Sequence, residues 1–212
     1  MATYRLYPAT NGAPNSQNFV TSDYIVGLSF KVTSAGLFHQ GFWWWVADAN
    51  QYAGPTDFAL WVVNGTASGT YVPGSKTTSG PLSVGWNFVR ANNQLALTLG
   101  QEYRAVTHTE GGTWQPLNGY ATTLQDFTAG GTHQAGVTNG PLYAFCSALG
   151  TGTVEPADSE QMTAYNGGTD VTSATSYPTA GVNSNVWLDI QVGTGALAGG
   201  GKMTYGFLAA MS

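Results

Sequence analysis

Short apolar runs in which every second residue is hydrophobic constrain this chain more than any other feature. From Val26 to Val32, large apolar residues alternate with small or polar ones. An alternation with a period of two is typical of a β-strand that turns one face toward a core. Most of the 29 glycines, with many Ser, Thr and Asn residues, lie between such runs, as expected for many turns and few helices. The pattern therefore predicts an all-β protein whose strand at residues 23–33 is half-buried.

Other segments have a strand-like composition, namely residues 37–47, 58–63, 71–73, 85–90, 94–99, 102–108, 142–148, 186–192 and 203–208. Asn64-Gly65 gives the strongest hairpin signal, because these residues suit the tight turns that join antiparallel strands. About eight to ten strands on one chain favour two packed antiparallel sheets. We therefore expect an antiparallel β-sandwich.

The chain of 212 residues has a length that commonly forms one all-β domain. We expect that domain to span residues 1–192. Residues 193–212 read as a Gly-rich linker and a C-terminal strand that packs on the same domain or on a neighbouring subunit. Residues 109–135 lack alternation, and a stretch of this kind is typical of a long functional loop or an element that sequence patterns do not reveal.

Charge and cysteine content narrow the range of partners. Only 8% of residues are charged, and the six Lys and Arg residues leave little to neutralise phosphate, which dominates nucleic-acid affinity. The apolar runs are shorter than the roughly 20 residues of a membrane-spanning helix. Cys146 is the one cysteine, so an intrachain disulfide and a zinc-cysteine cluster are excluded. We expect no nucleic acid, no membrane insertion, no metal and no cofactor.

Aromatic residues are the main candidates for binding. Trp114 and Tyr120 lie in a Gly- and Gln-containing segment with His108 near its start, and they could form a ligand or adhesion patch. The alternative is that both rings anchor the loop to the core.

Three consecutive tryptophans form a second candidate. Strand alternation sends Trp44 to the face opposite Trp43 and Trp45. One face should belong to the core, and the other could be a subunit interface, where exposed aromatic patches are usual.

Signs of catalysis are weak. His39, His108 and His133 lie in no recognisable nucleophile or metal motif. The eleven acidic residues are scattered, and Asp189 within an apolar strand is expected to bond a neighbouring strand or turn. Two loops contain several oxygen ligands that could bind calcium, namely Asp48, Asn50 and Asp57 in one and Glu155, Asp158 and Glu160 in the other. We expect the chain not to be an enzyme.

Several segments in order resemble a bacterial β-sandwich family catalogued as domain of unknown function 4082, often appended to secreted carbohydrate-active enzymes. The matching segments are residues 26–30, 58–61, 64–66, 85–88, 99–103, 177–178 and 185–189. The resemblance implies a jelly-roll-like sandwich and a carbohydrate-facing role, and it implies no catalytic residues. The chain departs from the family in the Trp43-Trp44-Trp45 run and in its Gly-rich C-terminal segment, and we expect it to have neither a leader nor an attached enzyme.

These features favour a non-catalytic structural or accessory protein of a bacteriophage virion, either a capsid decoration protein or a minor tail protein. It would be made in the host cytoplasm, sit at the virion surface, bind other virion proteins and its own copies, and display a polar surface with adhesion to cell-surface glycan. The alternative is an extracellular carbohydrate-binding module that recognises a polysaccharide.

Overall fold

The computed structural model describes residues 2–6, 18–20, 23–46, 55–65, 68–109, 113–115, 137–144, 163–181 and 188–195. Within these ranges the chain is all-β, with fifteen strands and one short 3-10 helix, η3 (Ala174–Ser176). Eight strands have four residues or more: β3 (Tyr24–Val32), β4 (Phe38–Val46), β5 (Asp57–Gly65), β6 (Ser68–Tyr71), β8 (Gly85–Arg90), β9 (Glu102–Thr109), β13 (Thr163–Gly167) and β15 (Leu188–Gly193). The others are β1 (Thr3–Arg5), β2 (Asn18–Val20), β7 (Thr77–Thr78), β10 (Thr113–Gln115), β11 (Val137–Asn139), β12 (Leu142–Ala144) and β14 (Ala180–Gly181).

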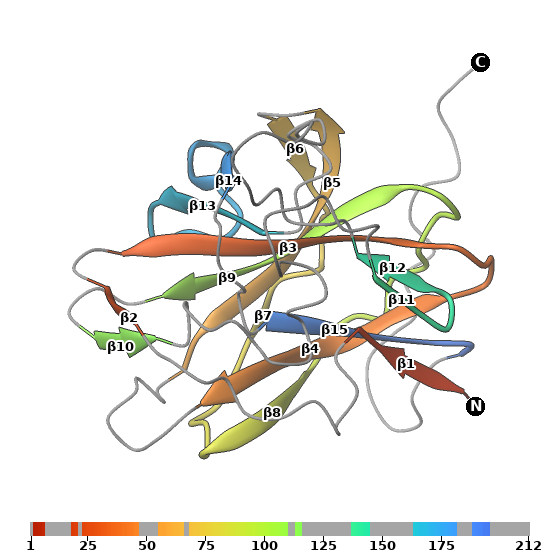
Figure 1. Cartoon of the computed structure of the whole chain (residues 1–212), viewed down its shortest axis with the longest axis horizontal. Helices are drawn as coiled ribbons and strands as arrows, with labels where there is room; N and C mark the ends of the chain where they lie inside the picture. Colours follow the sequence, from red (N-terminus) through yellow and green to blue (C-terminus); the bar gives the residue numbers. More distant parts are fainter. Residues whose placement is uncertain are drawn as a thin grey trace, which may run out of the picture.

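The strands form two large sheets and a two-stranded ribbon, and every pair is antiparallel. The smaller sheet has the order β1-β15-β4-β8. The larger has nine strands and follows the path β11-β12-β3-β9-β5-β6, with β13, β14 and β7 attached along it. In Figure 1 the larger sheet occupies the upper half of the molecule and the smaller sheet the lower half. The ribbon pairs β2 with β10.

The hydrophobic core lies between the two sheets. Phe30 and Leu60 from the larger sheet and Phe42, Trp44 and Ile190 from the smaller one belong to a single cluster, and none of them is more than 2% exposed. Phe42 stacks on Phe58 across the core, with ring centroids 5.3 Å apart. The predicted antiparallel β-sandwich is therefore confirmed, while its jelly-roll connection stays a prediction.

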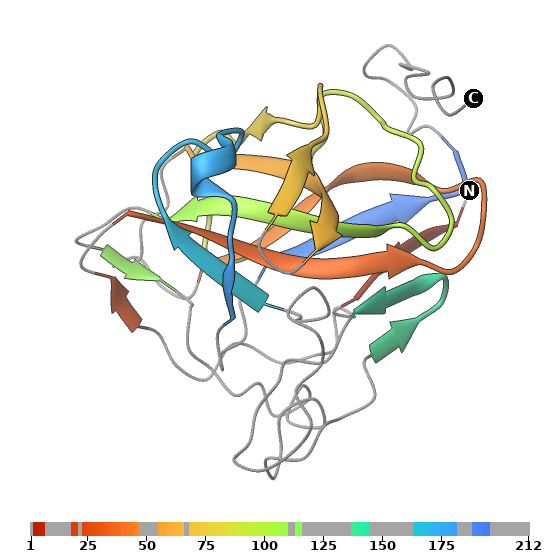
Figure 2. The same cartoon turned by 90° about the horizontal axis from the view of Figure 1, so that it is seen from above.

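The larger sheet is covered on its other face too. Residues 168–178, here called the covering segment, lie over it, and the helix η3 within this segment is visible from above in Figure 2. Trp61 donates an Nε1 hydrogen bond to the Val171 carbonyl oxygen at 2.8 Å, and Tyr177 packs on Trp61 with ring centroids 5.2 Å apart. Beneath Tyr177 the buried Arg104 donates from Nε to Ser29 Oγ at 2.8 Å and from a terminal nitrogen to the Pro178 carbonyl oxygen.

This cover corrects the prediction for residues 23–33. The apolar stripe of β3 faces the core as expected, but the strand is not half-buried, because Ile25 and Ser29 on its other face are also buried. Burial of Arg104 in the same layer lowers the pKa of its guanidinium. Ser29 of β3 and Arg104 of β9 therefore lie in an interior that alternation alone assigns to solvent.

Two other predictions need correction. Asn64 and Gly65 belong to the strand β5, where Gly65 pairs with Ser68, and the return strand β6 spans Ser68–Tyr71 and not residues 71–73. Residues 94–99 are not a strand. They make one isolated bridge, between Ala96 and Phe38, because they line the edge of β4 only briefly where β8 has ended.

Within the predicted loop at residues 109–135 the structure describes β10, and the remainder after residue 115 lies outside the described residues. At the other predicted boundary, Gly193 is the last residue of β15. The C-terminal strand expected at residues 203–208 also lies outside the described residues.

Candidate functional site

An aromatic layer lies on the face of the smaller sheet opposite to the buried Trp44, and two of its rings, Trp45 and Trp86, also pack against residues of the core cluster. The register of β4 and β8 places Trp43 opposite Phe88 and Trp45 opposite Trp86. Alternation sends these four side chains to one face and the buried Trp44 to the other. All four are half-buried. Their rings touch in pairs, with centroids 5.1 Å apart for Trp43 and Phe88 and 5.6 Å apart for Trp45 and Trp86.

An ion pair fixes this aromatic layer to the neighbouring strands. The Arg5 guanidinium lies 3.9 Å from the Trp43 ring centroid and 4.8 Å from that of Trp86. Its Nε donates to Asp189 Oδ2 at 3.2 Å, and Asp189 Oδ1 accepts the Leu6 N–H at 3.0 Å. Burial lowers the pKa of Arg5, and the nearby Asp189 carboxylate opposes that shift. The charge on Arg5 is therefore balanced inside the chain, and both indole rings are held in place.

A chain of amide groups fixes Trp43 from the other side. Its indole Nε1 donates to Gln191 Oε1 at 3.0 Å, Gln191 Nε2 donates to Gln40 Oε1 at 3.1 Å, and Gln40 Nε2 donates to the Gly195 carbonyl oxygen at 2.9 Å. The two glutamines meet at an irregularity in the β4–β15 ladder between Gln191 and Val192. Buried polar networks with every partner present rigidify their surroundings. The Trp43 ring is therefore preorganised.

The orientation of the rings limits the kind of ligand that the aromatic layer can bind. A sugar docks on a flat ring face that is open to solvent, with polar groups at its rim. One face of Trp43 instead carries the Arg5 guanidinium, and the Trp45 and Trp86 rings meet edge to face at 73°. Interlocked rings of this kind suit a protein surface, because protein interfaces are enriched in Trp, Phe and Arg.

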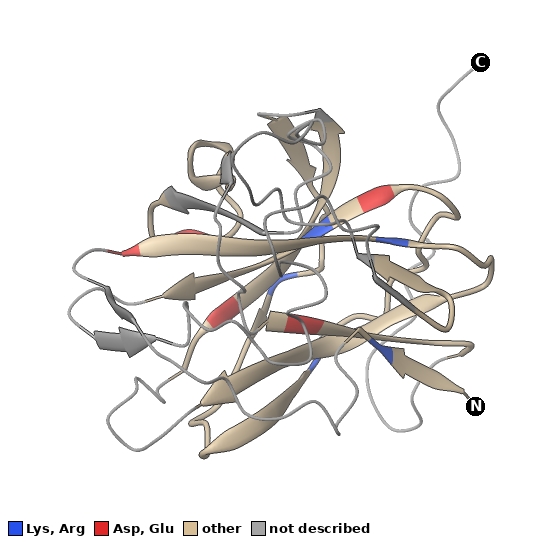
Figure 3. Cartoon of the chain, in the orientation of Figure 1, with Lys and Arg blue, Asp and Glu red and all other residues tan. Residues whose placement is uncertain are grey.

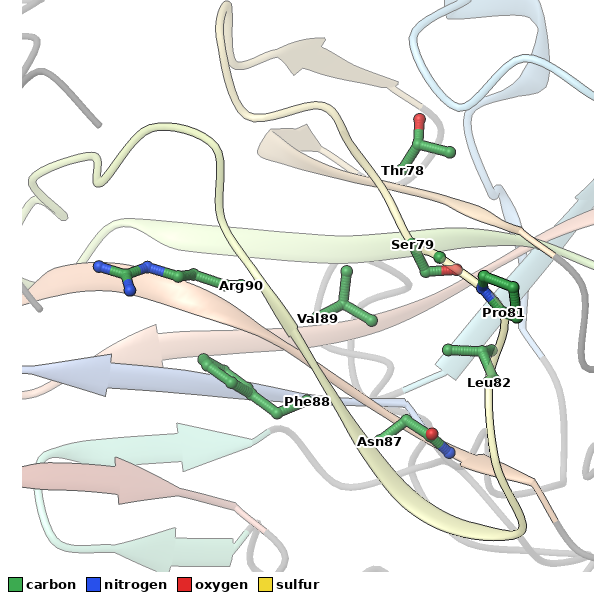
Figure 4. Close-up of a pocket in the computed structure, with 9 residues that line it drawn as sticks. Thr78, Ser79, Pro81, Leu82, Asn87, Phe88, Val89 and Arg90 are labelled. Carbon is green, nitrogen blue, oxygen red and sulfur yellow. The ribbon is translucent and has the colours of Figure 1, made fainter. Parts of the chain in front are cut away.

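A hollow of about 260 Å³ borders the aromatic layer at the edge of β8. Figure 4 shows Ser79, Pro81 and Leu82 along one side of it and Asn87 and Val89 from β8 along the other. Asn87 fixes the turn that leads into β8, since its Oδ1 accepts the Ser83 N–H at 2.9 Å. The hollow therefore has a polar, ordered rim and an apolar wall.

The predicted patch of His108, Trp114 and Tyr120 is placed only in part. His108 lies on β9, with Nε2 3.3 Å from Asp23 Oδ1. Trp114 lies on β10, opposite Phe19 of β2 in the register, and its side chain is outside the described residues, as is Tyr120 altogether. The patch stays a prediction.

The other predicted residues are placed more fully. Trp44 is a core residue, so an interface on this strand would use Trp43 and Trp45. Asp189 bonds neighbouring strands, as expected. The sequence analysis did not predict that Arg5 contacts the tryptophans or that β8 contributes Trp86 and Phe88 to the aromatic layer. The alternation of Trp86 with Phe88 was a usable signal for β8, whereas nothing in the sequence pairs it with β4.

Of the predicted calcium ligands, the structure describes Asp57, which forms an ion pair with Lys76 at 2.8 Å and accepts a hydrogen bond from Thr78. The remaining acids of the two loops lie outside the described residues. In the part of the chain that is described, no three His, Cys, Asp or Glu side chains gather closely enough to hold a metal ion. None of the described helical residues forms a helix long and apolar enough to cross a membrane.

No protein-family model, curated protein or solved structure matches this chain.

Proposed function

We propose that this chain is a non-catalytic contact module: a structural or accessory protein of a virion, decorating the capsid or associated with the tail. It would bind other virion proteins and its own copies through the aromatic layer of Trp43, Trp45, Trp86 and Phe88. The observation that carries the proposal is that four half-buried rings lie together on the face of the smaller sheet opposite to Trp44.

The composition of the layer supports a protein partner. Tryptophan and arginine are among the residue types that contribute most binding energy in protein interfaces, and phenylalanine is enriched there. Arg5 and the Gln191–Gln40 chain already hold Trp43 in one orientation. Side chains that are ordered before binding lose little conformational entropy on association. A small preorganised patch can therefore bind usefully.

Charged side chains contribute little to the proposed binding. Figure 3 shows the Lys, Arg, Asp and Glu residues of the described chain as isolated positions spread over the strands. Lys76 is paired with Asp57, and Arg5 with Asp189. A surface with so few charges exerts little long-range steering, so we expect binding that depends weakly on salt concentration.

The proposal is tested by the solution mass of the purified chain and by its fate among particles. Light scattering over a range of concentrations measures self-association. Sedimentation of particles from the producing culture, followed by detection of the chain with an antibody, measures incorporation. Trp45→Ser combined with Trp86→Ser removes half of the aromatic layer, and Leu99→Ser, at a side chain that is 55% exposed elsewhere, serves as the matched control.

We expect the wild-type and Leu99→Ser chains to associate and to sediment with particles, and the double variant to do neither while keeping its far-UV circular dichroism. A monomer that ignores particles but binds cell-wall polysaccharide, and loses that binding on Trp114→Ala, would establish the carbohydrate-binding alternative instead.

A further inference from the structure

Arg104 of β9 carries a positive charge inside the protein, beneath the covering segment. The residue is 1% exposed, and no carboxylate of the described residues lies within ion-pair distance of it. Glu102, on the same face of β9, attracts the guanidinium only from a greater distance. An arginine does not lose its proton in a protein, so the charge persists. A buried charge of this kind is costly unless an opposite charge lies against it.

The hydrogen bonds of the Arg104 guanidinium do not supply that opposite charge. Its Nε donates to Ser29 Oγ at 2.8 Å and its Nη1 donates to the Pro178 carbonyl oxygen, and both acceptors are neutral. The other terminal nitrogen, Nη2, is buried and has no hydrogen-bond partner among the described residues. Buried donors in folded proteins nearly always have an acceptor. Nη2 is therefore a donor on a charged group that still requires an acceptor.

The neighbouring residues are fitted to this side chain. A Cβ atom at Gly27 would lie 2.9 Å from both Cγ and Cδ of Arg104, so only glycine leaves room for its aliphatic part. The Tyr177 ring covers the guanidinium, with 5.2 Å between the ring centroid and Cζ. Gly69 in turn makes room for that ring, because a Cβ there would lie 2.4 Å from Tyr177 Cε2. The fold thus encloses the arginine closely.

Arg5 shows how the same chain neutralises a buried arginine. It too has a terminal nitrogen without a hydrogen-bond partner in the described chain, but its Nε lies 3.2 Å from Asp189 Oδ2. Arg104 has the same need for an anion and no such carboxylate. The comparison indicates that the anion at Arg104 comes from solution.

The enclosure determines which anion suits Nη2. Sulfate, phosphate and carboxylates have several oxygen atoms, each of which needs a donor when it is buried. A halide ion is a single atom and accepts hydrogen bonds from whatever donors face it. We propose that Arg104 Nη2 binds a halide ion, chloride under physiological conditions, beneath the covering segment. This site lies on the larger sheet, so it is independent of the proposed contact function, which uses the smaller sheet.

The bound ion would also stabilise the covering segment. Nη1 of the same guanidinium holds the Pro178 carbonyl oxygen, and Tyr177 lies over the guanidinium. Neutralising the charge removes a cost that is present only while the segment buries Arg104. Closure of the covering segment and binding of the anion should therefore strengthen each other.

The first test is the stability of the purified chain in chloride and in gluconate buffers of equal ionic strength. Gluconate is too large for the enclosed space and serves as the inert anion. Above the dissociation constant, a tenfold rise in chloride concentration should raise the melting temperature by about 3 to 5 °C. Hydrogen exchange at residues 170–178 should slow over the same range of chloride concentration.

Two variants assign this effect to Arg104. Arg104→Met keeps an apolar side chain beside Gly27 but removes the charge, and it should abolish the dependence on chloride. Lys76→Met is the matched control, because it removes a cation whose side chain is 41% exposed and should keep the dependence of the wild type. A chloride effect that persists in Arg104→Met would overturn the proposal.

Bromide in crystals of the wild-type chain gives a second test that needs no substitution. Bromide replaces chloride at halide sites and is located by its anomalous scattering. We expect a bromide peak beside Arg104 Nη2 and none beside Arg5, whose charge Asp189 already balances.

Three other results would overturn the halide site. One is a melting temperature and a rate of exchange at residues 170–178 that are the same in chloride and in gluconate. Another is a bromide peak at Arg104 without any effect of chloride in solution, which would mark an adventitious ion only. The third is a crystal structure in which a carboxylate of the chain itself lies against Nη2.

Discussion

Arg5 and Asp189, 184 residues apart in the sequence, form an ion pair of 3.2 Å that joins β1 to β15 beside the aromatic layer. The Asp189 side chain is fully buried and that of Arg5 is 14% exposed, so removal of either leaves a poorly solvated charge. Losing one partner of a buried pair typically costs about 3 to 5 kcal/mol. We expect Asp189→Asn to lower the free energy of unfolding by about 3 kcal/mol, as measured by urea denaturation followed by tryptophan fluorescence.

The matched control is the exposed ion pair of Lys76 and Asp57. It is shorter, at 2.8 Å, but its side chains are 41% and 26% exposed. Exposed pairs contribute about 1 kcal/mol or less. Lys76→Met should therefore change stability far less than Asp189→Asn, and equal effects at the two sites would contradict this account of Arg5 and Asp189.

His39 should make the fold sensitive to mild acid. Its ring is completely buried and packs edge-on against Phe42, and burial lowers its pKa to about 3. In the unfolded chain a histidine takes up a proton near pH 6.5, so below that pH the unfolded state binds more protons than the folded one. Stability should fall by about 1.4 kcal/mol per pH unit from pH 6.5 down toward pH 3.

The window between pH 6.5 and pH 5 separates this effect from that of the carboxylates, most of which stay ionised there. His39→Leu removes the titrating ring and should flatten the dependence of the unfolding free energy on pH in that window. Urea denaturation at several pH values measures both slopes. A wild-type chain with no slope between these pH values would show that His39 does not stay neutral in the fold.

Gly41 allows the close approach of β4 and β8. A Cβ atom at this position would lie 2.5 Å from the Val89 carbonyl oxygen and 2.6 Å from the Phe88 ring. Overpacking of this kind typically costs about 1 to 3 kcal/mol. Gly41→Ala should be destabilising and should shift the near-UV circular dichroism of the aromatic layer, whereas Gly80→Ala, with nothing within 4 Å, should have little effect in the same thermal melts.

The sequence contained enough information for the class of fold and for single strands. Alternation located β3 and β9, and it placed Trp44 on the face opposite to Trp43 and Trp45, although it did not say which of the two faces is the core. The pairing of strands that are far apart in the sequence could not be predicted, because a period of two indicates which face a side chain takes and not which strand lies beside it. Arg5 illustrates this limit, since its partners Trp43 and Asp189 come from two other strands.

The covering segment was missed for a different reason. Residues 168–178 are rich in Ser and Thr, a composition typical of a solvent-exposed loop. Their cover depends on a few anchors, chiefly Val171 and Tyr177, which carry no periodic signal. Arg104 within β9 likewise reads as a solvent-facing position until the segment that buries it is known.

The attachment of the covering segment can be weakened without disturbing the two sheets. Trp61→Phe keeps an aromatic ring in the layer but removes the Nε1–H that binds the Val171 carbonyl oxygen at 2.8 Å. Leaving that buried oxygen without a donor costs about 1 to 3 kcal/mol, and the loss falls on the segment that is held least elsewhere. Hydrogen exchange should therefore quicken at residues 170–178 while amides of β3 and β9 keep their protection.

Tyr71→Phe is the control for this prediction. Tyr71 packs on the same Trp61 ring, with centroids 5.9 Å apart, but its hydroxyl accepts a hydrogen bond from the Lys76 N–H and makes none to Val171. If both variants released residues 170–178 equally, ring packing and not the Trp61–Val171 hydrogen bond would hold the segment.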